Sequence, residues 1–586
     1  MNTNHKLLET LHKLGSEGKA VERLYARMLD ENLFLAAYAN LYSNDGAMTT
    51  GVDPEDKIDG MSLSRIQEII QTLEHNDWKW QPVRRKHIPK ANGKMRPLGI
   101  PGWSDKLVQE VVRMVLEAYY EPRFHDESHG FRQHRSCHTA LLQIKKTWTG
   151  VVWFVEGDIK GCFDNIDHNL LLQIVGQRVR DFRFLKLLRT MLKAGYWEDG
   201  QQRQTLSGTP QGGIVSPLLA NIFLHELDEY VLKVLKPAFD KGTRRRINKE
   251  YEKLNNQLHQ ARRQGNIPEA KRLERMRREV PRSDPTDPDF RRLYYVRYAD
   301  DFLIGIIGSK AETDDIKAKI GSKLAELRLE MSQEKTVITN AAHESARFLG
   351  YDIYKAQDLT HRHVNGRVQL SVPEDRAAHL AKRYLSDGKP IHRNALIDAD
   401  VPEIIHIFDM ELRGYYNYYK LAYNVSTRLN KLKYSMWYSL MRTLARKMKS
   451  SVSKLMRRYK VIGPKTGKKC VGVEMKTDRG ERLITFGDLR LVVDWNPYDK
   501  DVDPYHPALR QRELIFRLKH HECELCGHES DCLEVHHIRR LKDIRRKVRE
   551  GKGQEWELVM AARNRKALVV CRECHLKIHG KSLKVR

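Results

Sequence analysis

The sequence lacks any apolar stretch that is long enough to cross a bilayer. Its apolar runs, such as 151–155 and 302–307, are much shorter than the roughly 20 residues that a membrane-spanning helix needs. The first residues, Met-Asn-Thr-Asn-His-Lys, also lack the apolar segment of a secretion signal. We therefore expect a protein that works inside the cell and does not insert into a membrane.

Acidic residues and cysteines are both scarce. Asp and Glu number 76 against 104 Lys and Arg, which leaves a formal charge of +28. This excess indicates a polyanionic partner, with nucleic acid as the first choice and an anionic membrane surface as the alternative. Four of the eight cysteines form two Cys-x-x-Cys pairs near the C-terminus. Without a secretion signal, these pairs indicate metal ligands in a reducing compartment rather than disulfides.

Two adjacent aspartates, Asp300 and Asp301, stand between two short segments rich in β-branched and aromatic residues, 294–298 and 302–307. This pattern predicts a strand, a tight turn and a returning strand. Because neighbouring side chains on a strand point to opposite faces, only a turn brings both carboxylates near one point. Such a pair attracts a divalent cation of the magnesium kind, although an isolated Asp-Asp turn is more often a solvated hairpin tip.

A third carboxylate that would complete this pair follows an earlier apolar segment. Residues 151–155 predict a buried strand that continues to Asp158 and leads into a helix. A carboxylate at the end of a buried strand is costly unless it is paired or binds a metal ion. The nearby Asp164 and Asp167 are better explained as helix-start and turn residues.

Two further segments are candidates for binding an anionic substrate. Residues 83–101 predict a hairpin around Asn92-Gly93, with Lys90 and Arg96 on opposite sides of the turn. Both side chains can contact one anion there, such as a triphosphate, although surface charge on an ordinary hairpin is the alternative. The segment 207–221 places two glycines before a helix, which lets the backbone approach a ligand closely.

The other patterns predict an α+β layout, and 586 residues suffice for three or four domains with their own cores. Residues 1–80 are predicted to be mostly helical, and 105–120 form an amphipathic helix. The charged segment 238–292 predicts a solvated helical hairpin inserted before the Asp-Asp strand. A helix through Leu327 precedes strand signals at 348–353, so we expect helices and strands to alternate around one sheet.

Residues 431–470 contain thirteen Lys or Arg and no acidic residue. The same segment carries apolar residues at helical spacing, including Trp437, Leu440 and Leu444, so one face of these helices can pack on the protein. We expect the other face to contact a polyanion, in preference to being an ordinary basic surface. The aromatic residues at 415–419 suit packing or stacking on unpaired bases.

The C-terminal segment combines the two cysteine pairs with several histidines. Four thiolates in this arrangement are typical of a structural zinc site, whose ligands would be Cys523, Cys526, Cys571 and Cys574. Cys532 is left over and is not expected to be a ligand. His575 and His579 lie one helical turn apart, so both can bind one ion. His536 and His537 stand together at the end of a predicted strand.

The order of these features resembles that of the reverse transcriptases of group II intron-encoded proteins. The resemblance covers roughly residues 35–355 and includes motifs at 96–101, 208–217 and 333–336. The C-terminal segment resembles an HNH nuclease finger. The resemblance implies an α+β multidomain chain: a right-hand polymerase with fingers and palm, a helical thumb or maturase domain, a basic DNA-binding region and a small zinc-containing HNH finger of the ββα-metal type.

This resemblance also implies where the domains begin and end. The N-terminal helical extension comes first, followed by the fingers and palm with their charged insertion. The thumb or maturase domain, the DNA-binding region and the HNH domain complete the chain. The implied boundaries of these five regions are 1–80, 81–370, 371–470, 471–515 and 516–586.

In the polymerase, the resemblance implies a site for two Mg²⁺ ions, whose ligands would be Asp158, Asp300, Asp301 and the backbone carbonyl of Ile159. Lys90 and Arg96 would neutralise the triphosphate of the incoming nucleotide, and Gln211 would line its pocket. Phe163 would stack under the sugar and exclude a 2′-hydroxyl, which implies a preference for deoxynucleotides. Lys335 would lie near the primer end.

In the HNH finger, the resemblance implies a catalytic divalent ion, Mg²⁺ or Mn²⁺, whose ligands would be His536, His575 and His579. His537 would be the general base that acts on water, with Asn564 fixing its ring. A histidine pair alone is usually an ordinary core or surface feature, so this interpretation depends on the combination with Asn564 and the zinc cysteines.

These features together predict an RNA-directed DNA polymerase that is also a maturase for its own intron RNA and an endonuclease that nicks target double-stranded DNA. The nick would supply the 3′-hydroxyl primer that is extended with dNTPs on the intron RNA. We expect the protein to act in the bacterial cytoplasm or in an organelle of bacterial descent. Two alternatives stay open: a maturase that acts only as an RNA-binding splicing factor, and a host-defence nuclease that borrowed a polymerase domain.

Overall fold

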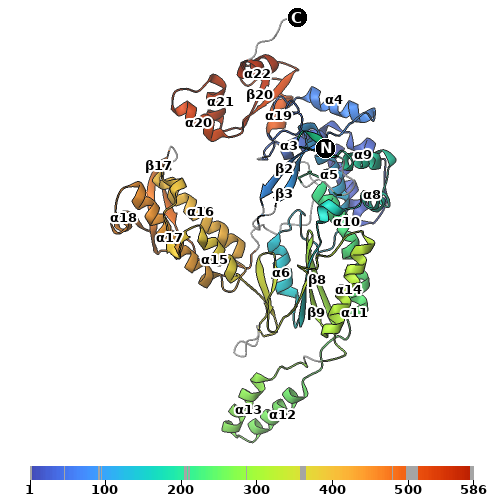
Figure 1. The fold of residues 1–586 in the computed structure, drawn as a ribbon, viewed down its shortest axis with the longest axis vertical. Helices are drawn as coiled ribbons and strands as arrows, with labels where there is room; N and C mark the ends of the chain where they lie inside the picture. Colours follow the sequence, from blue (N-terminus) through green and yellow to red (C-terminus); the bar gives the residue numbers. More distant parts are fainter. Residues whose placement is uncertain are drawn as a thin grey trace.

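The computed structural model is elongated, with a sheet-containing body between a C-terminal unit at one end and a projecting helical hairpin at the other (Figure 1). The described residues are 3–44, 46–89, 93, 95–203, 208, 212–284, 287–356, 365–477, 480–496 and 513–580. Among these residues, no helix combines the length and the apolarity that crossing a membrane requires.

The N-terminal region is helical, as predicted, and packs around α5 (Trp103–Tyr120). Its helices are α1 (Thr3–Ser16), α2 (Leu24–Met28), α3 (Glu31–Leu41) and α4 (Leu63–Glu74). The predicted amphipathic helix is present and its apolar face is buried, but polar residues on its other face are buried as well. They find internal partners: Lys106 donates to the carbonyl of Thr49, and the amide N–H of Ile214 donates to Gln109. The helix is therefore enclosed by neighbours on all sides.

The predicted basic hairpin is present as β2 (Val83–Pro89) and β3 (Met95–Ile100), which pair antiparallel with Ile88 opposite Arg96. They belong to a four-stranded sheet of order β3-β2-β6-β7, with β6 at Tyr196–Glu198 and β7 at Gln201–Arg203. Lys90 in the turn of this hairpin and Gln211 in the glycine-rich loop lie outside the described residues.

The central sheet is antiparallel and has the order β10-β4-β9-β8. Its strands are β4 (Trp153–Asp158), β8 (Arg292–Tyr298), β9 (Asp301–Ile307) and β10 (Val337–Asn340). Side chains alternate between two cores: Val155 and Ile304 pack with α10 (Ser216–Tyr230) and α14 (Lys310–Glu326), whereas Phe154 and Leu303 pack with α6 (Cys137–Thr147). Helices on both faces bury this sheet and leave its ends accessible.

The expectation of a single sheet is wrong. Residues 346–355 form two strands, β11 (Ala346–Phe348) and β12 (Tyr351–Lys355), which join β13 (Val368–Ser371) in a separate three-stranded sheet. The cause is the turn between them, where Leu349 and Gly350 both have positive φ, 46° and 72°. Such a turn reverses the chain at once, so the apolar run cannot continue as one strand.

Residues 374–486 form a helical unit with its own sheet. The helices are α15 (Glu374–Lys382), α16 (Val401–Tyr419), α17 (Val425–Lys447) and α18 (Val452–Arg458), and the strands are β16 (Lys460–Ile462), β17 (Lys469–Thr477) and β18 (Gly480–Phe486). Val471 and Phe486 of the sheet share a core with Phe408 and Leu412 of α16. The sheet and the helices are therefore one packed body.

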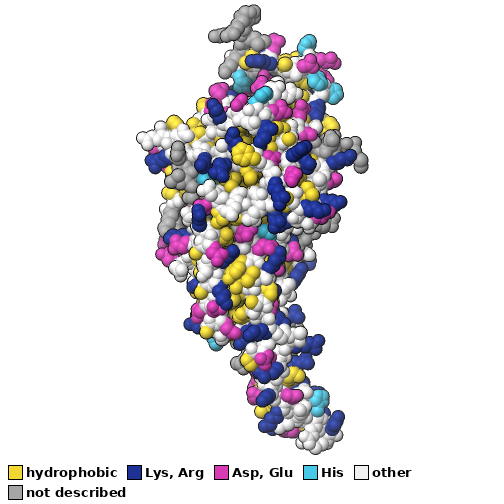
Figure 2. Space-filling model, turned by 90° about the vertical axis from the view of Figure 1, so that its right-hand side faces the viewer, with side chains coloured by type: hydrophobic (Ala, Val, Ile, Leu, Met, Phe, Trp, Pro, Cys, Tyr) yellow, Lys and Arg dark blue, Asp and Glu magenta, His cyan; other side chains and the backbone are white. Residues whose placement is uncertain are grey.

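The charged insertion is the predicted helical hairpin, α12 (Lys249–Arg263) and α13 (Ile267–Glu279). It projects from the body, with Lys and Arg side chains along it (Figures 1 and 2). A small core of its own holds it together, made of Leu254, Leu258, Ala261 and Leu273. Helices this short need such packing because propensity alone does not stabilise them.

The C-terminal unit lies against the N-terminal helices (Figure 1). It consists of α19 (Glu513–Lys519), β19 (Leu533–His537), α20 (Leu541–Arg549), α21 (Glu555–Arg563), β20 (Ala567–Cys571) and α22 (Arg572–Ile578). Its apolar residues, such as Val535 and Leu568, belong to the same core as Phe34 and Tyr38 of α3. This continuous core joins two parts of the chain that are almost 500 positions apart, since Tyr38 and His537 are separated by 499 residues.

Candidate active sites

The three predicted aspartates line one cavity of about 970 Å³ at the end of the central sheet. Asp158, the last residue of β4, lies opposite Asp301, the first residue of β9. Asp300 stands in the turn between β8 and β9, where Ala299 has a φ of 55°. Sheet register and a tight turn thus bring the three carboxylates to the same cavity, and we call it the aspartate cavity.

Close packing around the cavity requires two glycines. A side chain on Gly157 would begin 2.0 Å from the ring of Phe302, and one on Gly130 would begin 2.3 Å from the backbone nitrogen of Ala299. Neither contact is sterically possible. Positions 157 and 130 must therefore lack a side chain, which allows β4 and the turn at Ala299 to approach their neighbours.

The electrostatics of the cavity favour a bound cation. Burial, together with the charge of Asp158, raises the pKa of Asp300, and burial together with the charge of Asp300 raises the pKa of Asp301 to about 7. Lys335 Nζ lies 2.9 Å from both carboxylate oxygens of Asp158 and supplies one positive charge. Arg96 also acts to lower the pKa of Asp300, but the pKa values of Asp300 and Asp301 stay raised, so the residues present fit the divalent metal ions that a two-metal centre would hold.

Three other predicted residues line the same cavity: Arg96, Ile159 and Phe163. The backbone around Ile159 is held by Ile159–Met331 bridge pairing, with Lys160 N–H donating to the carbonyl of Glu330. Phe163 meets the ring of Phe131 edge-on at a centroid distance of 6.0 Å. The structure therefore brings together the described members of the predicted nucleotide site.

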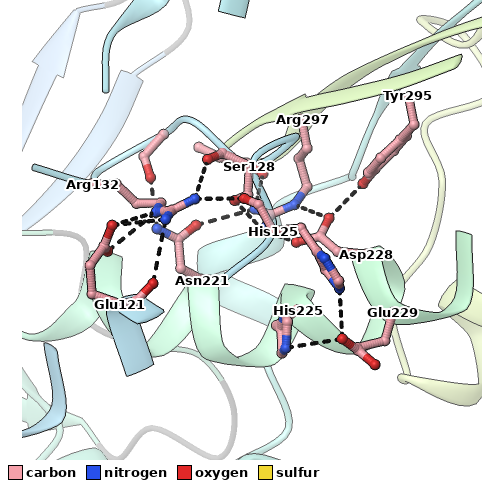
Figure 3. A network of polar contacts seen from close by, with 12 residues as sticks. Glu121, His125, Ser128, Arg132, Asn221, His225, Asp228, Glu229, Tyr295 and Arg297 are labelled. Atoms are coloured by element: carbon pink, nitrogen blue, oxygen red, sulfur yellow. Dashed lines mark hydrogen bonds and ion pairs between the residues drawn. The ribbon is translucent and has the colours of Figure 1, made fainter. Parts of the chain in front are cut away.

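A buried polar network lies beside the turn that carries Asp300 (Figure 3). Arg297 of β8 and Asp228 of α10 are both fully buried, with Arg297 Nη2 2.5 Å from Asp228 Oδ2 and Nε 2.7 Å from Oδ1. Tyr295 donates its hydroxyl proton to Asp228 at 2.8 Å, and Arg297 also donates to Ser128 Oγ at 2.8 Å. Although burial opposes ionisation, the Arg297 guanidinium holds the pKa of Asp228 below its usual range.

This network holds the turn directly. Arg297 Nη1 donates to the carbonyl of Ala299 at 2.9 Å, and the Arg297 carbonyl accepts from the N–H of His129 at 2.9 Å. Sequence analysis did not identify Arg297 or Asp228. The available signal was an arginine inside an apolar strand, because a buried charge needs a buried partner.

Another group with metal-binding side chains lies next to this network: His125, His225 and Glu229 (Figure 3). Its carboxylate already has partners, because Nε2 of His125 lies 2.6 Å from Glu229 Oε1 and Nζ of Lys233 lies 2.6 Å from Oε2. A lysine that supplies the positive charge removes the need for a cation. We assign no function to this group.

The second candidate site lies in the C-terminal unit, where β19 and β20 pair antiparallel and α22 follows at once. His536 comes from β19, whereas His575 and His579 come from α22 and its C-terminal cap, with 3.2 Å between their Nε2 atoms. Glu534 fixes the orientation of the His575 ring, because Nδ1 of His575 lies 2.5 Å from Oε2 of Glu534. That bond leaves Nε2 facing the cluster, the arrangement typical of a metal-ligating histidine.

A fourth member of this cluster comes from the N-terminal region. The carboxylate of Asp59 lies within ligand distance of the three histidines, and we call Asp59, His536, His575 and His579 the histidine cluster. Both ring nitrogens of His536, which is 5% exposed, lack a hydrogen-bond partner. A buried imidazole without a partner fits a bound divalent ion. Sequence analysis did not identify Asp59, and its local sequence carries no signal of a metal site.

The predicted general base His537 is buried, and its Nε2 lies 2.8 Å from the hydroxyl of Tyr38. Burial lowers the pKa of His537 to about 3, so the ring is neutral near pH 7. The Asn564 side chain accepts a hydrogen bond from Arg545 at 2.8 Å, at the end of α21. Tyr38, which sequence analysis missed, is thus a direct partner of this ring.

The four predicted zinc cysteines form a second cluster in the same unit, with all sulfurs within 4.8 Å of one another. Sγ of Cys526 and Cys571 are 3.9 Å apart, close to the roughly 3.8 Å expected between thiolates around tetrahedral zinc. Burial opposes ionisation of Cys523, but backbone hydrogen bonds lower its pKa to about 7. Cys532 is exposed and lies outside the cluster, as predicted.

Three family models match consecutive parts of the chain. The model described as reverse transcriptase (RNA-dependent DNA polymerase) matches residues 88–353. The type II intron maturase model matches 368–482, and the AI2M/AI1M-like HNH endonuclease model matches 523–575. The first match contains the aspartate cavity, and the third contains the cysteine cluster and two of the three clustered histidines.

Several relatives align with nearly the whole of this chain. The group II intron-encoded protein LtrA of Lactococcus lactis is 40% identical over 98% of this chain and 99% of its own length. An uncharacterised 91 kDa protein in the cob intron of Schizosaccharomyces pombe is 36% identical over 95% of this chain and 69% of its own length. The putative COX1/OXI3 intron 2 protein of Saccharomyces cerevisiae is 32% identical over 99% of this chain and 67% of its own.

Proposed function

This chain belongs to the group II intron-encoded proteins and contains reverse transcriptase, maturase and HNH endonuclease domains, and from this premise we propose that it copies its own intron RNA into DNA at a nick that it makes itself. The nick in one strand of the target DNA supplies a 3′-hydroxyl. The polymerase extends this primer with dNTPs on the intron RNA, and the maturase binds the same RNA. One chain then couples cleavage to synthesis.

In the polymerase, Asp158, Asp300, Asp301 and the carbonyl of Ile159 would hold two Mg²⁺ ions, which would supply positive charge for the primer 3′-hydroxyl and for the triphosphate. The proposal is supported by the shared cavity and by the raised pKa values of Asp300 and Asp301. Before a metal ion binds, Lys335 compensates Asp158.

The substrate contacts follow from the residues around that cavity. Arg96 and Lys90 bind the triphosphate, Gln211 lines the nucleotide pocket, and Lys335 moves from Asp158 to the primer end. Phe163 forms the floor under the sugar, which selects deoxynucleotides by leaving no room for a 2′-hydroxyl. The position of Phe163 against Phe131 at the cavity wall supports this role.

In the nuclease, His536, His575 and His579 would hold a divalent ion, which would supply Lewis acidity at the scissile phosphate. His537 takes a proton from water, and Asn564 fixes its ring once the site is loaded; in the structure that ring contacts the hydroxyl of Tyr38, and Asn564 accepts from Arg545. The four cysteines hold a structural zinc ion that keeps β19, β20 and α22 together. The position of His537 next to the proposed ligand His536 on β19 supports its role as the base.

The fingers and palm correspond to residues 81–370, and the thumb or maturase domain begins at 371. The boundary predicted after residue 470 falls inside the pairing of β16 with β17, so we propose that this domain extends to about residue 496. Its basic helices α17 and α18 bind the intron RNA. The DNA-binding region then continues to residue 515 and leads into the nuclease.

The single observation that carries the proposal is the convergence of Asp158, Asp300 and Asp301 on one cavity. Its test is primer extension on an RNA template with dNTPs and Mg²⁺. The wild type should make cDNA, and the Asp300→Asn, Asp301→Asn variant should lose at least about 10³-fold in rate. The matched control replaces another adjacent pair, Asp314 and Asp315, which are exposed on α14, and should keep wild-type extension.

Absence of cDNA from the wild type, with tight binding of intron RNA intact, would overturn the polymerase assignment. The chain would then act as a splicing factor alone. DNA nicking by the same preparations reports on the nuclease independently, because the three clustered histidines lie in the C-terminal unit, away from the aspartate cavity.

A further inference from the structure

Asp59 lies in the connection between α3 and α4, yet its carboxylate points into the C-terminal unit. Oδ2 of Asp59 is 2.8 Å from Nε2 of His579 and 3.4 Å from Nε2 of His575. Oδ1 is 3.3 Å from Nδ1 of His536. The side chain is 7% exposed, so this carboxylate is buried among three imidazoles.

Hydrogen bonds alone do not satisfy this arrangement. The contact of His575 Nδ1 with Glu534 places a ring proton there, which leaves the lone pair of Nε2 facing the carboxylate of Asp59 and Nε2 of His579. A second proton on His575 would relieve that contact, but Nε2 of His536 would still lack a partner, and Nδ1 of His536, although 3.3 Å from Oδ1 of Asp59, makes no hydrogen bond of good geometry. One cation between the four groups satisfies all of them.

The backbone fixes Asp59 in this position. Gly60 N–H donates to the carbonyl of Val535 at 3.1 Å, and Val535 N–H donates to the carbonyl of Met61 at 2.9 Å. Residues 60–61 thereby pair with the edge of β19 that β20 does not use. In addition, the N–H of His537 donates to Asp59 Oδ1 at 2.8 Å. The carboxylate is thus pre-positioned, which is a property of ligands rather than of incidental surface contacts.

We propose that Asp59 is a fourth protein ligand of the divalent ion in the nuclease, so that this metal site is shared between the N-terminal region and the HNH finger. The inference rests on the proposed nuclease function and adds a ligand from outside the finger. The ion fastens together residues that are 520 positions apart. The nuclease site is then complete only when the finger is docked on the N-terminal helices.

The ligand set also indicates the kind of ion. Three imidazoles and one carboxylate suit a transition-metal ion such as Mn²⁺ better than Mg²⁺, which prefers oxygen ligands. A six-coordinate ion keeps two positions free for the phosphate and water. A tetrahedral ion such as Zn²⁺ would have its four positions filled, so we assign the site to a six-coordinate ion.

The test measures Mn²⁺ binding by the full chain, using the electron paramagnetic resonance signal of the free ion. All variants carry Asp300→Asn and Asp301→Asn, which removes the aspartate cavity as a competing site. Asp59→Asn should weaken Mn²⁺ binding at least about 10-fold. This change keeps Oδ1 as an acceptor for the N–H of His537, and retention of bound zinc shows that the finger is folded.

Two comparisons make the result decisive. The control Glu55→Gln changes an exposed carboxylate in the same connection and should leave Mn²⁺ affinity unchanged. His536→Ala should abolish binding. If it does so while Asp59→Asn binds as well as the control, the Asp59 proposal fails alone. If His536→Ala binds normally, the finger holds no such ion, and the proposed nuclease site fails with it.

A second assay measures how fast the Asp59→Asn variant, with no other change, nicks a DNA duplex in the presence of Mn²⁺. The rate shows whether Asp59 is a metal ligand or blocks the site. If Asp59 is a ligand, the variant should nick DNA more slowly, and excess Mn²⁺ should partly restore the rate. Faster nicking, or tighter Mn²⁺ binding, would mean that Asp59 blocks the site, and it would overturn the proposal.

Discussion

The aspartate cavity takes its three carboxylates from neighbouring strands of one sheet, whereas the histidine cluster takes its members from residues 520 positions apart. Asp158 and Asp301 are opposite each other in a ladder of backbone hydrogen bonds. Asp59 reaches His579 only because a separate unit docks on the N-terminal helices. The first site is built by strand register, and the second by packing between distant parts of the chain.

The two sites also differ in what stabilises them. Beside the aspartate cavity lies the ion pair of Arg297 and Asp228, inside a large core that many elements share. The nuclease sheet has two strands, which are marginal without further support. The cysteine cluster and the docking of residues 60–61 provide that support. The comparison predicts that each site can be destroyed without the other.

The largest effect should come from Cys571→Ser. Loss of one zinc ligand removes the ion that holds β20 to α22, so the finger unfolds and nicking is lost completely. Primer extension should stay within about twofold of wild type, because the aspartate cavity is distant from the finger. Zinc content, nicking and extension are measured on one preparation. Cys532→Ser, outside the cluster, is the control and should retain both activities.

Breaking the buried ion pair of Arg297 and Asp228 should have the next largest effect. Here extension is lost and nicking is retained, the reverse of the result for Cys571→Ser. Arg297→Met leaves Asp228 as an unpaired buried charge and should cost about 3–5 kcal/mol of unfolding free energy. Extension should fall steeply because the Ala299 carbonyl loses its donor, while nicking persists at temperatures where the chain stays folded. Denaturant unfolding and both activity assays provide the measurements.

A triple variant separates stability from positioning in that network. Replacing Arg297, Asp228 and Tyr295 by Met, Leu and Phe removes every charged or donating member, so most of the lost stability should return. Extension should remain low, because no guanidinium holds the turn. Recovery of extension together with stability would show that the network only stabilises the fold.

A smaller effect is expected from pH, which should change extension and nicking differently. The pKa of Asp301 is about 7, above its usual value, so the carboxyl is protonated and binds cations poorly at lower pH. At subsaturating Mg²⁺, extension should fall by about tenfold between pH 8 and pH 6. His537, whose pKa burial lowers to about 3, should add no titration of its own to nicking in this range.

Lys335 provides the check on this assignment. Its positive charge lowers the pKa of Asp301, so Lys335→Met should move the Mg²⁺-binding profile of the polymerase to higher pH. A profile that does not move, or moves to lower pH, would show that another group controls the titration. Mg²⁺ binding is followed by calorimetry in the absence of nucleic acid.

The smallest effect should follow deletion of residues 249–279 with a short glycine linker. The hairpin has its own core, and Ile247 pairs with Ser283 at its base, so the body should close without it. Extension and nicking should both stay within about twofold of wild type. Loss of either activity would show that the insertion contributes to that site, and would break the separation between them.

The comparisons confirm the predicted family and both enzyme classes, and local sequence patterns predicted much of the secondary structure. The Asp-Asp turn, the helical insertion and the cysteine cluster all occur as expected. These features are encoded within short segments. The separate sheet of β11–β13 was missed because one turn at Leu349-Gly350 divides a run that looks like a single strand.

The sequence by itself determined which chemical groups this protein carries: three aspartates around a turn, four thiolates and a set of histidines, since residue type and spacing are local properties. Only the tertiary structure decided that Arg297 meets Asp228 and that Asp59 and Tyr38 join the nuclease histidines. Those pairs depend on which surfaces pack together. Packing is governed by the burial of apolar area over the whole chain, which leaves no mark in the few residues that it brings into contact.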